Sequence, residues 1–170
     1  MLSPLLRLKE KIINNGGFIN AHAHLDRANT ADAYSVDEQK KQLADKWQIV
    51  DQLKRKSTYY DYKKRIDSVL DDQVAKGIKT VCSFIDVDSV VSSKAIIPAV
   101  ELSKSRTDIK LVVACQTLKG VLNRTEDTIL RNHMSQIDII GSLPGADKGR
   151  ESEHLDKLMG WVKKYDKLLH

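Results

Sequence analysis

The chain has 170 residues, of which 41% are hydrophobic and 30% charged, and this composition predicts one globular domain with a real core rather than a disordered tail. No window approaches the roughly 18 uncharged apolar residues that a membrane-spanning helix needs. The N-terminus lacks a basic segment followed by a long apolar stretch, and the two cysteines lie in apolar runs rather than in a disulfide framework. Together these features predict a cytoplasmic protein.

The formal net charge of +5 raises the question of a nucleic-acid partner. Much of the basic excess lies between residues 40 and 65, in the runs Lys54-Arg55-Lys56 and Lys63-Lys64-Arg65. Acidic residues are interleaved with these cations and no aromatic stacking platform accompanies them. A solvated helix face is therefore the favoured interpretation, and we expect neither a nucleic-acid nor a membrane partner.

Capping signals and helical spacing predict helices along the whole chain. Ser3-Pro4 reads as an N-cap followed by proline, Ser35-Val36-Asp37-Glu38 is a capping-box sequence, and Gly77 stops a third helix. The expected helices cover about residues 4–14, 36–54, 60–76 and 92–104, then a short segment capped by Thr125 and a last helix capped by Ser152. The last helix should bury the apolar face formed by Leu155, Leu158, Met159 and Val162.

Five apolar segments alternate with these helices and are predicted to be strands. They cover about residues 18–24, 78–85, 109–115 and 137–140, with a fifth strand beginning near 167. After the first gap their spacing is close to thirty residues, the size of one βαβ unit, and apolar rather than alternating strands indicate a parallel sheet covered by helices. A doubly wound sheet and a (β/α)₈ barrel both give this pattern. A barrel usually needs about 250 residues, so residues 1–170 would form one domain holding strands one to four and the start of strand five.

Candidate site residues lie where the predicted strands end. His22 and His24 are separated by one residue, so on a strand they point the same way, with Cβ atoms about 7 Å apart. Two imidazoles at that spacing can converge on one metal ion. Asp86 and Gln116 end the second and third strands, and parallel strands would bring them to the same rim as the histidines.

From Gly16 onward the sequence resembles the amidohydrolase superfamily, and specifically its cytosine-deaminase-like branch. The most specific block is His22-Ala23-His24-Leu25-Asp26. The stretches ending in Ile85-Asp86-Val87-Asp88 and in Ala114-Cys115-Gln116 also match, as does the approach to the fifth strand. The resemblance implies the N-terminal half of a (β/α)₈ barrel enzyme that carries a divalent metal, iron or zinc, at its strand ends.

The resemblance also implies a reaction and roles for particular residues. The metal generates hydroxide that attacks an amidine or amide carbon of a small nitrogen heterocycle and releases ammonia or an amine. His22 and His24 match two metal ligands, and Gln116 matches a glutamine that contacts the pyrimidine ring; Asp86 is expected on the substrate side with it. The other ligands and the proton-transfer residues belong to strands five, six and eight, which these 170 residues do not encode. We therefore expect a truncated N-terminal part that is inactive alone and self-associates as a homo-oligomer.

Departures from the family pattern keep other functions open. Phe84 occupies the position where the family often has a histidine, two extra residues lie between Gln116 and Gly120, and the usual N-terminal β-sandwich is missing. The loss of the second-strand histidine would permit hydrolysis of an N-substituted triazine or another cyclic amide. A non-catalytic half-barrel that only packs against a partner is the alternative from another class.

Other polar residues have simpler interpretations. Asp88 can equally cap the next helix, and His133 and His154 read as surface or partly buried helix residues. The family's fifth-strand histidine ligand would fall about two residues past His170, so His170 itself is not expected to be a ligand.

Overall fold

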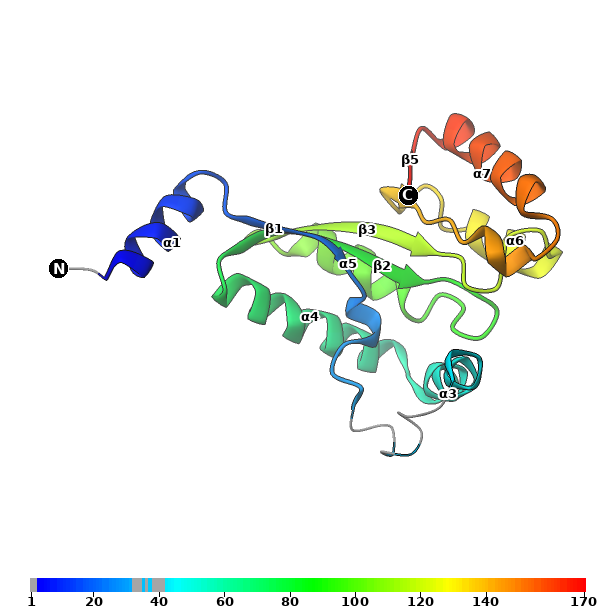
Figure 1. Cartoon of the computed structure of the whole chain (residues 1–170), viewed down its shortest axis with the longest axis horizontal. Coiled ribbons are helices and arrows are strands. Elements are labelled where there is room, and N and C mark those ends of the chain that lie inside the picture. Colours follow the sequence, from blue (N-terminus) through cyan, green and yellow to red (C-terminus); the bar gives the residue numbers. More distant parts are fainter. Residues whose placement is uncertain (1–2, 32–34, 36, 38–41) are drawn as a thin grey trace.

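Five parallel strands form one curled sheet in the order β1-β2-β3-β4-β5 in the computed structural model, which describes residues 3–31, 35, 37 and 42–170. The sheet and its helices form half of a (β/α)₈-type barrel (Figure 1). This confirms the half-barrel that the family resemblance implied, whereas the spacing of the apolar segments was equally compatible with a doubly wound sheet. The strands are β1 (Phe18–Ala23), β2 (Ile78–Asp86), β3 (Lys110–Gln116), β4 (Ile139–Ile140) and β5 (Leu168–Leu169).

Helices connect successive strands, and α4 and α5 cover one face of the sheet (Figure 1). At one end of the sheet α1 projects away from the body, and α3 lies near the other end. Among the described residues no helix is both long and apolar enough to cross a membrane. The helices are α1 (Pro4–Asn14), α3 (Leu43–Lys56), α4 (Tyr59–Ala75), α5 (Ile96–Ser105), α6 (Arg124–Arg131) and α7 (Glu151–Tyr165), with short 3₁₀ turns η1 (Leu25–Arg27) and η3 (Pro144–Asp147).

Several helix ends follow the sequence signals, and others do not. The hydroxyl of Ser3 caps α1 by accepting from the Leu6 amide, as expected. Helix α6 is capped two residues earlier than predicted, by Asn123 rather than Thr125, because the Asn123 side chain accepts from the Thr125 amide. The capping box expected at residues 35–38 includes positions outside the described residues, and the described helix α3 begins at Leu43.

The two faces of the central strands differ in burial. Alternate residues of β2 and β3, such as Val81, Ile85 and Val113, are fully buried in the core against the helices. Their neighbours on the other face, such as Thr80 and Val112, are only half-buried. This second face is the one that would line the interior of a closed barrel; it is accessible at Thr80 and Val112 but buried at Phe84 and Ala114.

Helix α7 buries a different face from the predicted one. Leu158 is buried as expected, but Leu155 and Met159 are more than one-third exposed, and His154 and Trp161 are buried instead. The interpretation of His154 as a surface or partly buried residue was wrong, and so was that of His133, which is buried as well. His154 is tolerated in the core because both ring nitrogens have partners: Nδ1 lies 2.7 Å from Asp147 Oδ2 and Nε2 lies 3.5 Å from Ser142 Oγ.

Gly141 follows β4 at a point where no side chain fits. A Cβ atom added there would lie 2.1 Å from the carbonyl oxygen of Cys115, which is backbone and cannot move aside. We expect Gly141→Ala to destabilise the fold by at least about 2 kcal/mol in denaturant unfolding. The matched control is Gly160→Ala, whose Cβ meets nothing within 4 Å inside α7 and should stabilise by about 0.5–1 kcal/mol. Equal effects of the two substitutions would contradict the close approach at Gly141.

The outer edge of β1 has no strand partner among the described residues, and its Ile19 side chain is 70% exposed. Unpaired backbone groups beside apolar side chains favour pairing with another chain. We expect sedimentation of the 170-residue chain at micromolar concentration to show a dimer or larger assembly, and Ile19→Lys to shift it toward monomer. Tyr60→Lys, at a similarly exposed position on α4 away from any strand edge, is the control. A wild-type monomer would contradict this expectation.

Candidate functional site

His22 and His24 turn their rings toward each other on the accessible face of the sheet. Their Nε2 atoms are 3.2 Å apart, and the His22 ring stacks on Phe84 with a centroid distance of 4.5 Å. The prediction that the two imidazoles point to the same side of the first strand is confirmed.

The tautomer of His24 follows from its neighbour Arg27. One Arg27 nitrogen, Nη2, lies 3.2 Å from His24 Nδ1, and a guanidinium can only donate, so Nδ1 accepts. The proton of a neutral His24 is then on Nε2, where it is donated to His22 Nε2. Burial, with the nearby Arg27 and His22 charges, lowers the pKa of His24 and favours this neutral form.

Arg27 joins the histidines to the ends of the next two strands. Its Nη2 atom lies 2.6 Å from Gln116 Oε1 and 3.2 Å from Asp86 Oδ1. Asp86 and Gln116 are also direct partners in the parallel register of β2 and β3. The predicted common rim of His24, Asp86 and Gln116 is therefore confirmed, with an arginine at its centre.

Lys54 of α3 forms ion pairs with carboxylates at the end of β2. Its Nζ lies 2.9 Å from Asp86 Oδ2 and 2.5 Å from Asp88 Oδ2, and the residue is only 3% exposed. Burial alone would lower the pKa of Lys54, but the two carboxylates outweigh it and raise that pKa. The interpretation of Lys54 as part of a solvated helix face was wrong. Asp88 also caps the turn after β2, since its Oδ1 accepts from the Val90 and Val91 amides.

Asp26 lies beneath the rim and is fully buried. Its Oδ2 accepts from the Asp86 amide, while Oδ1 has no hydrogen-bond partner among the described residues. Burial, followed by the neighbouring Asp86 carboxylate, raises the pKa of Asp26 to about 7. A protonated Asp26 therefore fits this position better than a carboxylate does below neutral pH.

His170 lies closer to the histidine pair than the sequence suggested. Its ring centroid is 5.5 Å from that of His22 and 4.6 Å from that of Phe84, so Phe84 packs against both imidazoles. The backbone of His170 is fixed beside β4, because its amide donates to Ile140 and its carbonyl accepts from Ser142.

The two histidines have the spacing of two ligands of one metal ion. Two ligands of a tetrahedral zinc ion with bonds of 2.0–2.1 Å are about 3.3 Å apart, close to the separation of the two Nε2 atoms. Among the described residues no group of three or more His, Cys, Asp or Glu side chains is arranged to hold a metal ion. The chain thus offers two ligands, and a full coordination shell needs others.

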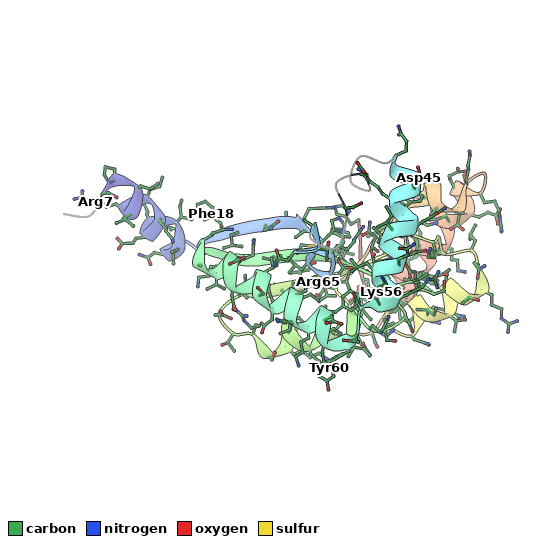
Figure 2. The ribbon with its side chains drawn as sticks, turned by 90° about the horizontal axis from the view of Figure 1, so that it is seen from below. Arg7, Phe18, Asp45, Lys56, Tyr60 and Arg65 are labelled. Atoms are coloured by element: carbon green, nitrogen blue, oxygen red, sulfur yellow. The ribbon has the colours of Figure 1, made fainter. Side chains whose placement is uncertain are left out.

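Sequence reasoning missed Arg27 and Lys54, although signals for both exist. Arg27 follows the histidine motif by three residues, which is within reach of the same rim. Lys54 falls four and seven residues after Val50 and Trp47, on the stripe predicted to face the protein. Figure 2 shows α3, from Asp45 to Lys56, lying near the end of the sheet opposite α1.

Comparisons with known proteins show what the fold of this chain is similar to. No family model matches the chain. An uncharacterized protein from Haemophilus influenzae is 33% identical over 168 residues, covering 96% of this chain and 61% of that protein, so the chain spans about three-fifths of its relative.

Two solved enzymes share the fold. Structures of 5-methylcytosine deaminase from Klebsiella pneumoniae, liganded with phosphonocytosine or 5-fluorocytosine, match with a TM-score of 0.80 and 20% identity, over 90% of this chain and 38% of theirs. N-isopropylammelide isopropylaminohydrolase from Burkholderia multivorans matches with a TM-score of 0.68 and 19% identity, over 90% of this chain and 39% of its own. The chain therefore has the fold of less than two-fifths of these enzymes.

The raised pKa of Asp26 has a consequence for stability. Because the folded-state pKa of about 7 exceeds the ordinary value of 3.8, the folded chain holds this proton more tightly. That contribution to stability is fully present below about pH 4 and is lost as the pH rises through 7. We expect the isosteric Asp26→Asn substitution to remove this part of the pH dependence, measured as the free energy of unfolding between pH 4 and 8. A wild-type stability that rises over this range, with the same slope in the variant, would contradict the assignment.

Proposed function

We propose that the chain is the N-terminal part of a metal-dependent hydrolase in the cytosine-deaminase-like branch of the amidohydrolases, acting on C–N bonds other than peptide bonds in a small nitrogen heterocycle. The observation that carries the proposal is the pair of Nε2 atoms 3.2 Å apart on the accessible face of a half-barrel. The fold shared with a deaminase and an aminohydrolase supports it.

In this mechanism His22 and His24 would hold an iron or zinc ion. Such an ion, when bound, would supply hydroxide near neutral pH for hydrolysis at the amidine or amide carbon. Gln116 would orient the ring from the neighbouring strand end. Asp86 would act through Arg27 rather than on the ring, because both of its carboxylate oxygens face cations. The remaining ligands and the proton shuttle would come from outside these 170 residues.

Hydrolysis of a triazine or another cyclic amide is the second candidate within this proposal. Phe84 favours it, because a phenyl ring packed against His22 supplies an apolar surface where a polar contact to cytosine would otherwise be available. This difference concerns the substrate and leaves the metal ligands unchanged.

The proposal predicts that the chain binds Zn²⁺ or Fe²⁺ through the histidine pair. We expect calorimetric titration to show one weak site, since only two ligands are present, and His22→Ala or His24→Ala to lower its affinity by roughly tenfold or more. His133→Gln is the control, because His133 pairs with Ser93 and Gln136 away from the rim. Metal affinity that neither His22→Ala nor His24→Ala changes would contradict the proposed ligands.

A further inference from the structure

Arg27 contacts the His24 ring at Nδ1, the nitrogen other than the one that faces His22. We infer that Arg27 controls metal binding at the histidine pair: it holds His24 in the tautomer that carries a proton on Nε2, and a metal ion binds there only when Arg27 releases Nδ1. The inference rests on the proposed function, because it concerns the regulation of the same two ligands.

The two nitrogens proposed as metal ligands are engaged with each other in this structure. The Nε2 atoms of His22 and His24 are 3.2 Å apart, so one of them donates and the other accepts. Because Arg27 Nη2 donates to His24 Nδ1, the donor is His24 Nε2. A ring nitrogen has to be free of its proton to bind a metal ion. In this tautomer the histidine pair is therefore closed to a metal ion.

His24 also has a partner for the opposite tautomer. Burial is the main cause that lowers the pKa of His24, and a backbone hydrogen bond with Phe84 acts against it. A backbone group with this effect accepts a ring proton, so the Phe84 carbonyl is an acceptor for a proton on Nδ1. Metal-binding histidines commonly donate their second ring nitrogen to a backbone carbonyl. Arg27 and Phe84 thus favour opposite tautomers of one ring.

The contact between Arg27 and His24 is weak enough to be displaced. Arg27 Nη2 has two hydrogens, yet it faces three acceptors: Gln116 Oε1 at 2.6 Å, and Asp86 Oδ1 and His24 Nδ1 both at 3.2 Å. The two longer contacts therefore share one hydrogen. When His24 is released, Asp86 no longer shares that hydrogen, and its charge makes it the better acceptor. We expect the contact to lower metal affinity by about tenfold rather than to abolish binding.

Asp86 keeps Arg27 beside the histidine pair. Asp86 is 1% exposed, and Lys54 Nζ lies 2.9 Å from its other oxygen, so the carboxylate is held from both ends. The guanidinium that Asp86 orients therefore stays within reach of His24 Nδ1. Arg27 is a positioning residue, because it acts on the metal ligand His24 and not on a metal ion or a substrate.

The tautomer of His24 is measured directly by imidazole ¹⁵N NMR. Spectra of the 170-residue chain are recorded near pH 8, where histidine is neutral, without metal and after addition of Zn²⁺. The His24 signals are assigned by their loss in His24→Gln. We expect metal-free His24 to carry its proton on Nε2, and Zn²⁺ to move it to Nδ1. In Arg27→Gln the metal-free ring should already favour Nδ1, because a glutamine carbonyl accepts where the guanidinium donated.

Zn²⁺ affinity of the Arg27 variants gives the size of the effect. In calorimetric titration we expect Arg27→Gln and Arg27→Met to bind Zn²⁺ about tenfold more tightly than the wild type does. Arg27→Lys keeps a charged donor and should gain least. Arg65→Met is the matched control for the loss of a positive charge, because Arg65 donates to the Asp26 carbonyl at 2.6 Å instead of to a histidine. Its Zn²⁺ affinity should stay close to that of the wild type.

A proton on Nδ1 of metal-free wild-type His24, an affinity that Arg27→Gln does not raise, or an equal gain in Arg65→Met would overturn the inference. A gain in Arg27→Met that disappears when Asp86→Asn is added would also overturn it, because the freed carboxylate would then be the cause. If the Arg27 variants do not fold, the wild-type tautomer with and without Zn²⁺ decides the question.

The same titrations report on the proposed function separately. Zn²⁺ binding that depends on His22 but does not change in the Arg27 variants would leave the proposed metal ligands standing and remove the role of Arg27 alone. A lack of Zn²⁺ binding in the wild type and in every Arg27 variant would remove both.

Discussion

Two carboxylates are buried at the end of β2, and their charges have to be balanced for the strand to end there. Asp86 and Asp88 are each no more than 1% exposed, and an unpaired buried charge would be strongly destabilising. Lys54 pairs with both carboxylates, and Arg27 pairs with Asp86 through its other oxygen. Because Lys54 belongs to α3, its ion pairs hold α3 against the end of β2. Arg27 lies between His24, Asp86 and Gln116 and contacts all three.

The parts of the site that the sequence predicted depend on the regular geometry of strands. The period of two along a strand places His22 and His24 on one side, and parallel order brings Asp86 and Gln116 to the same rim. The parallel order followed from the spacing of the apolar segments, because each helix has to return the chain to the start of the next parallel strand. The choice of a half-barrel over a doubly wound sheet came from the family resemblance. Most strand and helix ends differ by only a few residues from the expected ones; the exception is α3, which was expected from about residue 36 and begins at Leu43 in the described part of the chain.

The parts that the sequence did not predict depend on long-range pairing. Lys54 stands in a run of three cations, and nothing local to that run shows that its partners lie over thirty residues away, at Asp86 and Asp88. His154 was misplaced for the same reason: hydropathy favours a polar exterior, but pairing with Asp147 and Ser142 makes the core position tolerable. Burial of a polar side chain is decided by its partners, which the chain order does not reveal.

The position of Arg27 also links the histidine pair to the rest of the rim. Binding a metal through His24 Nε2 requires the ring proton to lie on Nδ1, the atom that now accepts from Arg27. A guanidinium cannot remain bonded to a protonated Nδ1, because both atoms would donate. Among the described residues, Arg27 Nη2 would then keep Asp86 and Gln116 as its acceptors, which strengthens its hold on the Gln116 carbonyl. The ligand role proposed for His24 is therefore compatible with the contacts of Arg27 to Asp86 and Gln116, because releasing His24 Nδ1 leaves both contacts in place.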